Sequence, residues 1–103
     1  MKGQIQLSPA AVQDLRDIWR GFAEYSNLTV ADEKVSRLQS KLILLSQFPE
    51  SGRRREELAV GMRSLPAAEF VIFYRILDGS IQIVRILNGR RDIDGIFQEQ
   101  EER

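Results

Sequence analysis

The most constraining feature of the sequence is the run FVIFYRILDGSIQIVRILNGRRD, residues 70 to 92, which is apolar on both sides of an Asp78-Gly79 pair. β-Branched and aromatic residues flank this pair, and Asp-Gly between two such runs is the strongest short-range signal for a β-hairpin. The sequence therefore predicts a two-strand hairpin with two apolar faces. Each face needs a cover, either from the rest of the chain or from a partner.

A two-residue turn pairs Leu77 with Ser80, and this register predicts which side chains share a face. One face then carries Val71, Phe73, Arg75, Val84 and Ile86. The opposite face carries Phe70, Ile72, Tyr74, Ile76, Ile81, Ile83, Arg85 and Leu87. Arg85 does not fit an apolar face, so we expect either a bulge that changes the register or an acidic partner such as Asp14, Asp17 or Glu69.

Two amphipathic helices precede the hairpin. Ser8 and Pro9 are typical of an N-cap and a first helical position, and a helix that starts there places Ala11, Leu15, Ile18, Trp19 and Phe22 at helical spacing. Trp19 is interpreted as a core anchor. Thr29 and Asp32 resemble a capping box for a second helix, whose apolar stripe of Ala31, Val35, Leu38, Leu42 and Leu45 ends at Phe48-Pro49. An antiparallel helix hairpin is predicted to cover the Tyr74 face.

Shorter elements complete the prediction. GQIQL, residues 3 to 7, alternates like a strand, and MRSL, residues 62 to 65, forms a short strand that ends at Pro66. Residues 49 to 61 are expected to be a loop with a short helical turn at Glu56 to Ala59. Asp92 caps a short C-terminal helix. The predicted fold class is α+β, with an N-terminal strand and an antiparallel helix hairpin packed on a small antiparallel sheet, in one domain over residues 1–103.

The Phe73 face remains without a long helix to cover it. An uncovered apolar patch usually marks an interaction surface. Alternatively, the short C-terminal helix folds over this face through Ile96 and Phe97. The residues leave both possibilities open.

The amino-acid composition excludes several kinds of catalytic and metal site. The chain has no cysteine and no histidine, so it lacks a thiolate nucleophile, the usual general base and the commonest metal ligands. We expect neither a cofactor nor a metal site. No stretch approaches the ~20 apolar residues of a membrane span, and no apolar segment follows Lys2, so a cytoplasmic location is expected. Residues 53 to 91 contain eight arginines against four acidic residues, and arginine suits bidentate contact with carboxylate or phosphate.

Five strings in this order resemble the ParE branch of the RelE/ParE superfamily, the toxins of bacterial type II toxin–antitoxin modules. They are LSPAAVQDLRDIW, FPESGRRREEL, GMRSLP, VIFYRI and IVRILNGRRDI. The resemblance covers nearly the whole chain and implies a compact fold that agrees with the predicted elements. The chain has Asn88 where ParE-like sequences often have histidine, so no role of that imidazole is transferred.

The resemblance implies one of two activities. RelE-like members are ribosome-dependent messenger-RNA endonucleases, which need a proton-transfer group and basic residues near the phosphate. This chain has Val71 and Phe97 at two of the positions concerned, which leaves Tyr74 and Arg91 as its candidates for such a site. ParE-like members trap DNA gyrase on cleaved DNA, which needs a binding surface and no proton transfer.

Three hypotheses follow: a gyrase-poisoning toxin, which is the leading one, a RelE-like ribonuclease, and a member that only binds an antitoxin. The expected partners are a ParD-like antitoxin in a hetero-oligomer and DNA gyrase, with no membrane and no sequence-specific nucleic-acid binding. The residues assigned to antitoxin or target binding are Arg63, Val71, Phe73, Arg75, Val84, Ile86, Arg90, Arg91 and Phe97.

Overall fold

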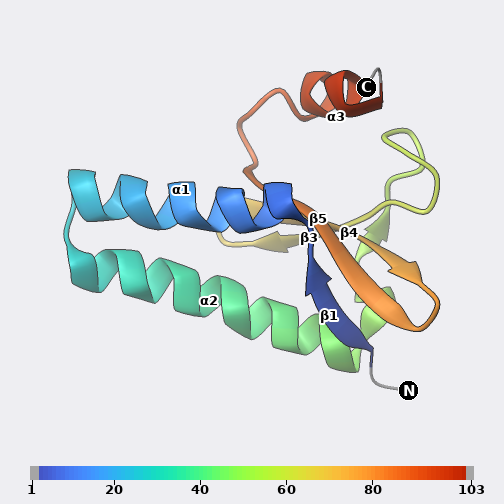
Figure 1. The fold of residues 1–103 in the computed structure, drawn as a ribbon, viewed down its shortest axis with the longest axis horizontal. Coiled ribbons are helices and arrows are strands. Elements are labelled where there is room, and N and C mark those ends of the chain that lie inside the picture. Colours follow the sequence, from blue (N-terminus) through green and yellow to red (C-terminus); the bar gives the residue numbers. More distant parts are fainter. Residues whose placement is uncertain (1–2, 102–103) are drawn as a thin grey trace.

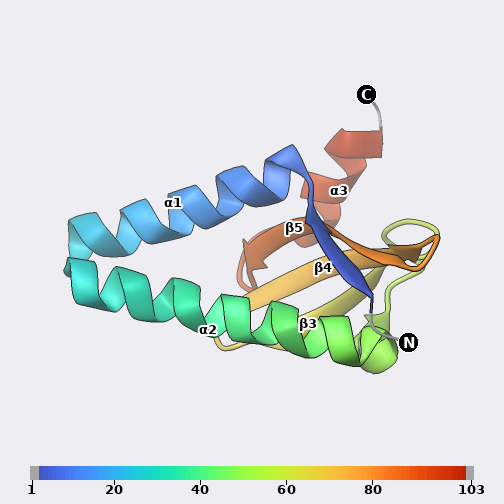
Figure 2. The same ribbon diagram turned by 60° about the horizontal axis from the view of Figure 1, so that its bottom comes forward.

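The computed structural model describes residues 3–101 and the side chains up to Gln98. A helix hairpin lies on one face of a twisted five-stranded sheet, and a short helix lies on the other side (Figures 1 and 2). The helices are α1 (Pro9–Tyr25), α2 (Leu28–Gln47) and α3 (Ile93–Glu101), with a 3₁₀ turn η1 (Pro49–Ser51). The strands are β1 (Gln4–Leu7), β2 (Arg53–Arg54), β3 (Arg63–Ala67), β4 (Phe70–Leu77) and β5 (Ser80–Asn88). The predicted α+β class is confirmed.

The strands lie in the order β1-β5-β4-β3-β2. Pairing is antiparallel except at one edge, where β1 pairs in parallel with β5 from Gln4 opposite Ser80 to Leu7 opposite Ile83. The Asp78-Gly79 turn has positive φ at both residues, 49° and 76°, as this turn type requires. The predicted hairpin is therefore confirmed, and the N-terminal strand adds a parallel edge to a sheet expected to be antiparallel.

Capping explains where the helices begin. The Ser8 hydroxyl accepts a hydrogen bond from the Ala11 N–H at 3.0 Å, and Pro9 is the first helical residue. The predicted cap of α2 at Thr29 is wrong by two residues, because the Asn27 side chain accepts from the Val30 N–H at 2.9 Å and caps the helix earlier. Asp92 accepts from the Gly95 N–H at 3.1 Å at the start of α3, as predicted.

The loop between β2 and β3 forms hydrogen-bonded turns in place of the predicted helical turn at Glu56 to Ala59. The strand predicted at residues 62 to 65 is observed as β3 and continues through Pro66. Pro66 is tolerated because, in this part of the strand, only β4 pairs with β3.

A bulge in β5 overturns the predicted register of the hairpin. Tyr74 pairs with Ile83 but Phe73 pairs with Arg85, so Val84 is an extra residue between them. The bulge reverses the faces of all residues beyond Val84. Ile86 therefore packs in the core beneath the helices, whereas Leu87 lies on the opposite face with Phe73.

The core has two parts. The larger part lies between the helix hairpin and the sheet and contains Leu38, Leu42 and Leu45, as predicted. Trp19 was predicted to belong to it, but the side chain is 38% exposed, because α1 turns Ile18 and Phe22 toward the core instead. The smaller part lies on the other face of the sheet, under α3 and the loop before β3.

Candidate functional site

From the sequence, Tyr74 is the only residue proposed for proton transfer. In the structure, its hydroxyl group forms two hydrogen bonds to the backbone, a pair of contacts that we call the buried tie. The hydroxyl donates to the Pro49 carbonyl at 2.7 Å and accepts from the Gly52 N–H at 2.8 Å. A Cβ at position 52 would collide with this hydroxyl, which explains the glycine. Burial raises the pKa of Tyr74 above its ordinary value of 10.0. The group holds η1 against β4 and stays protonated at neutral pH.

Arg63 supports the same turn. Its Nη1 group donates to the carbonyls of Gly52 at 2.9 Å and Glu50 at 3.3 Å. Both are charge-assisted hydrogen bonds from a guanidinium to backbone carbonyls. The half-buried Arg63 therefore shapes the segment that carries η1, in addition to any contact with a partner.

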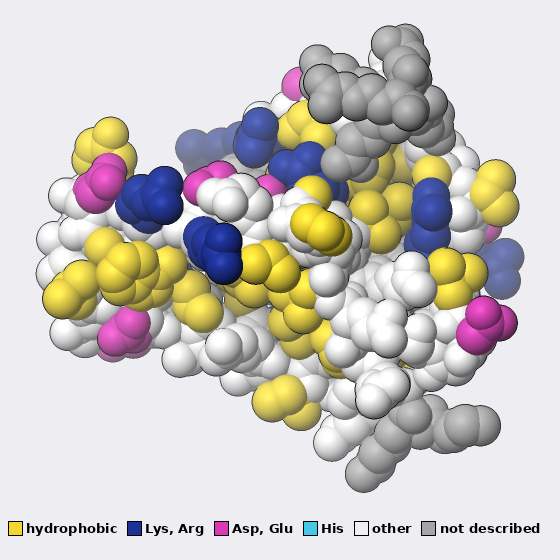
Figure 3. Space-filling view, in the orientation of Figure 1, with side chains coloured by type: hydrophobic (Ala, Val, Ile, Leu, Met, Phe, Trp, Pro, Cys, Tyr) yellow, Lys and Arg dark blue, Asp and Glu magenta, His cyan; other side chains and the backbone are white. Residues whose placement is uncertain are grey.

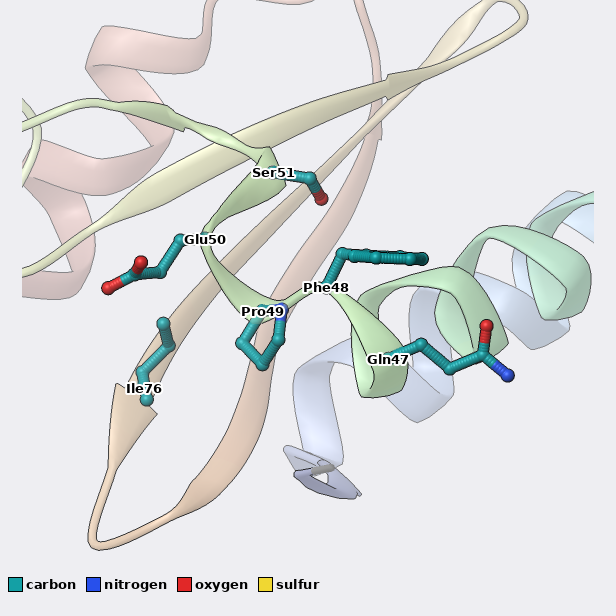
Figure 4. A pocket seen from close by; sticks show the side chains of 6 residues that line it. All are labelled: Gln47, Phe48, Pro49, Glu50, Ser51 and Ile76. Carbon is teal, nitrogen blue, oxygen red and sulfur yellow. The ribbon is translucent and has the colours of Figure 1, made fainter. Parts of the chain in front are cut away.

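An open hollow of about 670 Å³ lies beside this turn. Figure 4 shows the side chains around it: Gln47 at the end of α2, Phe48 just after that helix, Pro49, Glu50 and Ser51 in η1, and Ile76 from β4. Phe48 is 59% exposed and Ile76 is 37% exposed. A second hollow shares Glu50 and Ile76 and extends to Arg54, Arg63 and Met62. An exposed apolar surface thus continues to two arginines.

Sequence reasoning missed this surface, because Phe48 was interpreted only as the end of a helix and Ile76 as part of the core. One signal in the sequence could have predicted the exposure of Ile76. This residue lies close to the hairpin turn, at the end of β4 that the apolar stripe of α2 does not reach. Side chains there extend past the end of the helix that was expected to cover them.

The second face of the sheet is covered within this chain. Phe73 and Phe97 pack edge to face with ring centroids 4.9 Å apart, and Leu58, Met62 and Leu87 complete the cluster. Val71 and Val84 pack against its edge and are half-buried. The prediction of an open apolar face is wrong, and the alternative, in which α3 covers the face through Ile96 and Phe97, is confirmed. Ile86 is not on this face at all.

The Arg85 guanidinium lies against α1. Its Nε and Nη2 groups donate to the two carboxylate oxygens of Asp14 at 2.8 Å, and the Ile86 N–H donates to Asp14 at 2.9 Å. This hydrogen bonding raises the pKa of Arg85. Both expectations for Arg85 are met, since the bulge moves it opposite Phe73 and an acidic residue pairs with it.

The remaining predicted arginines do not form one cluster. Arg90 and Arg91 are exposed in the turn after β5, where the Asn88 side chain accepts from the Arg90 N–H at 2.9 Å. Asn88 pairs with Phe70 at one end of the hairpin, whereas Arg75 lies toward the other end, opposite Gln82. Among the described residues, the Nε atom of Arg75 is buried and has no hydrogen-bond partner. Tyr74 pairs with Ile83 in the middle of the hairpin and its hydroxyl bonds Pro49 and Gly52, whereas Arg91 follows Asn88 at the hairpin's end, so the two are not brought together as a catalytic pair.

Among the side chains that the structure describes, residues 3–98, no group of three or more acidic residues is arranged to hold a metal ion. No helix in this range is both long and apolar enough to cross a lipid bilayer.

The profile of the family described as "ParE toxin of type II toxin-antitoxin system, parDE" matches residues 5–93. This chain belongs to the ParE toxin family. The match covers most of the sequence and includes every helix and strand except part of β1 and most of α3. The chain is thus a toxin of the type II toxin–antitoxin class, as the resemblance of its five sequence strings implied.

Individual relatives agree with this assignment. Toxin ParE1 of Mycobacterium tuberculosis strain H37Rv is 33% identical over 95 residues, which cover 91% of this chain and 97% of the relative. Toxin ParE3 of Caulobacter vibrioides is 32% identical over 80 residues, 78% of this chain and 80% of the relative.

Solved structures share the fold. A chain from the chromosomal ParDE system of P. aeruginosa has a TM-score of 0.75 at 22% identity and covers 84% of this chain and 96% of its own length. A chain of the RelBE2 toxin–antitoxin complex of Mycobacterium tuberculosis has a TM-score of 0.55 at 20% identity, over 85% of this chain and 99% of its own.

Proposed function

We propose that this ParE-family toxin poisons DNA gyrase by binding it and that a cognate ParD-like antitoxin neutralises the toxin. Membership of the ParE family supports the toxin role, and the similar ParDE chain from P. aeruginosa comes from a toxin–antitoxin system. The observation that carries the choice of target is the use of the Tyr74 hydroxyl as a buried structural tie. The one candidate for proton transfer already uses its hydroxyl group for two hydrogen bonds within the fold.

A ribonuclease needs a group that takes a proton from the ribose 2′-hydroxyl and a cation that stabilises the phosphate. Tyr74 donates its own proton to a backbone carbonyl and has a raised pKa, both of which oppose its use as a base. Phe97 has no exchangeable proton and packs on Phe73. The arrangement favours a protein that acts by binding.

A binding toxin needs an exposed apolar surface with polar groups at its rim. The hollow lined by Phe48, Pro49 and Ile76, with Arg54 and Arg63 beside it, has this composition. It is our candidate for the target-binding surface. The exposed Arg90 and Arg91 remain proposed contacts with the antitoxin or the target.

The other proposed contacts differ in accessibility. Val71, Arg75 and Val84 are half-buried at the edge of the second face and remain accessible in part. Phe73 and Phe97 are buried against each other, so a partner could reach them only by lifting α3. Ile86 is 1% exposed beneath the helix hairpin, so it does not contact a partner in this fold.

Expression in bacteria tests the proposal. A gyrase-poisoning toxin should produce filamentous cells with broken DNA and an SOS response. Immediate arrest of translation with cleaved messenger RNA would instead identify a ribonuclease, and normal growth would identify a member that only binds its antitoxin.

A variant of the hollow refines this test. Phe48→Ser should preserve folding, since the side chain is 59% exposed, and should reduce toxicity. Val60→Ser is the matched control, because Val60 is 87% exposed and lies outside the hollow. Equal toxicity of the two variants would exclude the hollow as the target-binding surface.

A further inference from the structure

The last strand ends in an asparagine that is followed by a glycine. Asn88 is the final residue of β5 and lies opposite Phe70, and Gly89 begins the segment that leads to α3. The chain contains one other asparagine, Asn27, which is followed by a leucine. The side-chain carbonyl carbon of an asparagine is close enough to the next backbone nitrogen to close a ring with it. A glycine at that next position leaves the nitrogen unhindered.

The fold gives no steric reason for a glycine at position 89. Its φ lies outside the left-handed region. A Cβ at this position would meet Val71 Cγ2 at 3.6 Å and the Glu69 carbonyl oxygen at 3.7 Å, which are ordinary van der Waals contacts. At Gly52, in contrast, a Cβ would collide with the Tyr74 hydroxyl. What glycine adds at position 89 is a peptide group that turns freely and a nitrogen without a neighbouring side chain.

The Asn88 side chain is already folded back along the chain. Its Oδ1 atom accepts a hydrogen bond from the Arg90 N–H at 2.9 Å, which forms an Asx turn over the Gly89 peptide group. When a nucleophile attacks Cγ of Asn88, negative charge develops on Oδ1. The Arg90 N–H points at this atom and acts as a single oxyanion-hole donor. The turn therefore favours attack on Cγ.

The nucleophile would be the Gly89 nitrogen, which is hydrogen-bonded at the end of the sheet. Its N–H donates to the Glu69 carbonyl at 3.0 Å. This bond lies just beyond Asn88 and Phe70, the last pair of the β4–β5 ladder, and both of its partners are exposed. Hydrogen bonds at the ends of a ladder open by local fluctuation at little cost. The bond slows attack by the nitrogen but does not prevent it.

The local charge also favours the reaction, because the attacking nitrogen loses its proton. Arg90 and Arg91 follow directly and are exposed, and nearby cations stabilise an anionic group. The Glu69 carboxylate is paired with a lysine of α2 at 3.0 Å, and Asp92 caps α3. Figure 3 shows several basic side chains above α1, near the path that the segment between β5 and α3 takes in Figure 1.

We propose that Asn88 is a site of spontaneous deamidation, which converts it to aspartate and isoaspartate. The Gly89 nitrogen gives its proton to solvent and bonds to Cγ of Asn88, and the side-chain amide leaves as ammonia, so that a succinimide ring forms. Water then opens the ring. Cleavage of the bond from nitrogen to Cγ gives aspartate, whereas cleavage of the bond from nitrogen to the backbone carbonyl carbon gives isoaspartate. One water is consumed and one ammonia is released, without any oxidant or cofactor.

Either product changes this end of the molecule. Each places a carboxylate beside Arg90 and Arg91, and isoaspartate also inserts one carbon atom into the main chain between β5 and α3. The helix is held on the sheet by apolar contacts of Ile93, Ile96 and Phe97 with the smaller part of the core. A displaced connection should therefore loosen α3, so that the second face of the sheet becomes less well covered as the protein ages.

Peptide mass spectrometry tests the inference on the purified full chain, without antitoxin or gyrase. The protein is incubated in ¹⁸O-labelled water at neutral pH and is then digested with trypsin in ordinary water, so that only conversion before digestion carries the label. Cleavage after Arg85 and Arg90 releases Asn88 in residues 86–90, and Asn27 appears in residues 21–34 of the same sample. An isoaspartyl methyltransferase identifies isoaspartate.

Gly89→Ala is the matched variant, because a Cβ fits at this position and hinders the attacking nitrogen. Circular dichroism verifies that the variant is folded. We expect Asn88 to convert at least about 10-fold faster than Asn27, and at least about 5-fold more slowly in Gly89→Ala than in the native chain. Hydrogen exchange in α3 should increase in the incubated native chain and stay unchanged in the incubated variant.

Equal rates at Asn88 and Asn27 would overturn the inference, whether or not the variant folds. Conversion of folded Gly89→Ala at the native rate, or conversion to aspartate without isoaspartate, would also overturn it, since both contradict a succinimide formed by the Gly89 nitrogen. Unchanged exchange in α3 after full conversion would overturn the proposed loosening of this helix. Because the toxin is tested alone, these outcomes are independent of the proposed target and of the antitoxin.

Discussion

The substitution Tyr74→Phe tests the structural role of the buried hydroxyl most directly, because it preserves the ring and removes one oxygen. The hydroxyl accepts from the Gly52 N–H at 2.8 Å and donates to the Pro49 carbonyl at 2.7 Å. The Gly52 N–H is buried and loses its acceptor in the variant, and an unsatisfied buried donor costs about 1–3 kcal/mol. We expect a loss of about 2 kcal/mol in the free energy of unfolding.

Thermal unfolding followed by circular dichroism measures this loss. For a domain near 100 residues, 1 kcal/mol corresponds to about 4–8 °C, so the unfolding midpoint should fall by roughly 8–16 °C. Tyr25→Phe is the matched control, since Tyr25 is 90% exposed and should give no measurable change. A loss below about 0.5 kcal/mol for Tyr74→Phe would contradict the buried tie.

The same variant has a distinct pH dependence. Burial raises the pKa of Tyr74 in the folded protein above 10.0, whereas the unfolded chain has a pKa near the ordinary value of about 10. The stabilising contribution is therefore complete below pH 10 and is lost as the pH rises through the folded-state pKa. The difference in stability between the native chain and Tyr74→Phe should therefore stay constant up to about pH 10 and shrink between that pH and the higher folded-state pKa. A constant difference over this range would show that the hydroxyl does not titrate as a buried group.

Four further substitutions probe the two parts of the core, the Asp14–Arg85 ion pair and one surface contact. Leu42→Ala in the main core should cost about 2–5 kcal/mol in urea unfolding, and an unchanged midpoint would contradict the helix-hairpin core. Phe97→Ala should cost about 3 kcal/mol and increase hydrogen exchange in α3, whereas unchanged exchange would show that α3 is held by other contacts. Asp14→Ala leaves Arg85 without its partner and should cost about 3 kcal/mol, a loss that should persist in 1 M salt because the pair is largely shielded from solvent. Arg91→Ala should weaken target binding by about 1–3 kcal/mol with partial rescue by lysine, and full rescue would indicate a purely Coulombic contact.

Local signals in the sequence determined most of the fold. Ser8-Pro9, Phe48-Pro49 and Asp78-Gly79 each impose a backbone requirement that few residues meet, and all three mark boundaries in the structure. The spacing of Leu38, Leu42 and Leu45 identified the buried side of α2. These features depend on neighbours within one or two turns of chain, so they can be predicted without knowledge of tertiary contacts.

The bulge at Val84 could not be located from the sequence. Arg85 indicated that the simple register was incompatible with an apolar face, but its partner Asp14 is 71 residues away in the chain. The packing of α1 against β5 determines which residue of β5 forms the bulge, and this contact cannot be read from the sequence. The error reversed the predicted positions of Ile86 and Leu87, because side chains alternate across a strand.

The candidate surfaces were the least predictable part. Trp19 and Phe48 are large apolar residues at helical spacing, and their exposure depends on how far each helix extends beyond the sheet. In contrast, Phe73 was expected to be open and is covered by Phe97 from α3. A pattern of apolar residues predicts that a surface needs a cover, but tertiary packing decides whether the chain or a partner provides it.

The central claim is that this ParE-family chain acts on DNA gyrase by binding and not by cleaving RNA. Purified toxin should be incubated with gyrase, supercoiled plasmid and ATP, and the DNA should be analysed after the enzyme is denatured. The account predicts linear DNA that accumulates with toxin concentration, that is suppressed by the antitoxin and that persists with Tyr74→Phe. Unchanged plasmid, together with cleavage of messenger RNA on translating ribosomes that disappears in Tyr74→Phe, would contradict it.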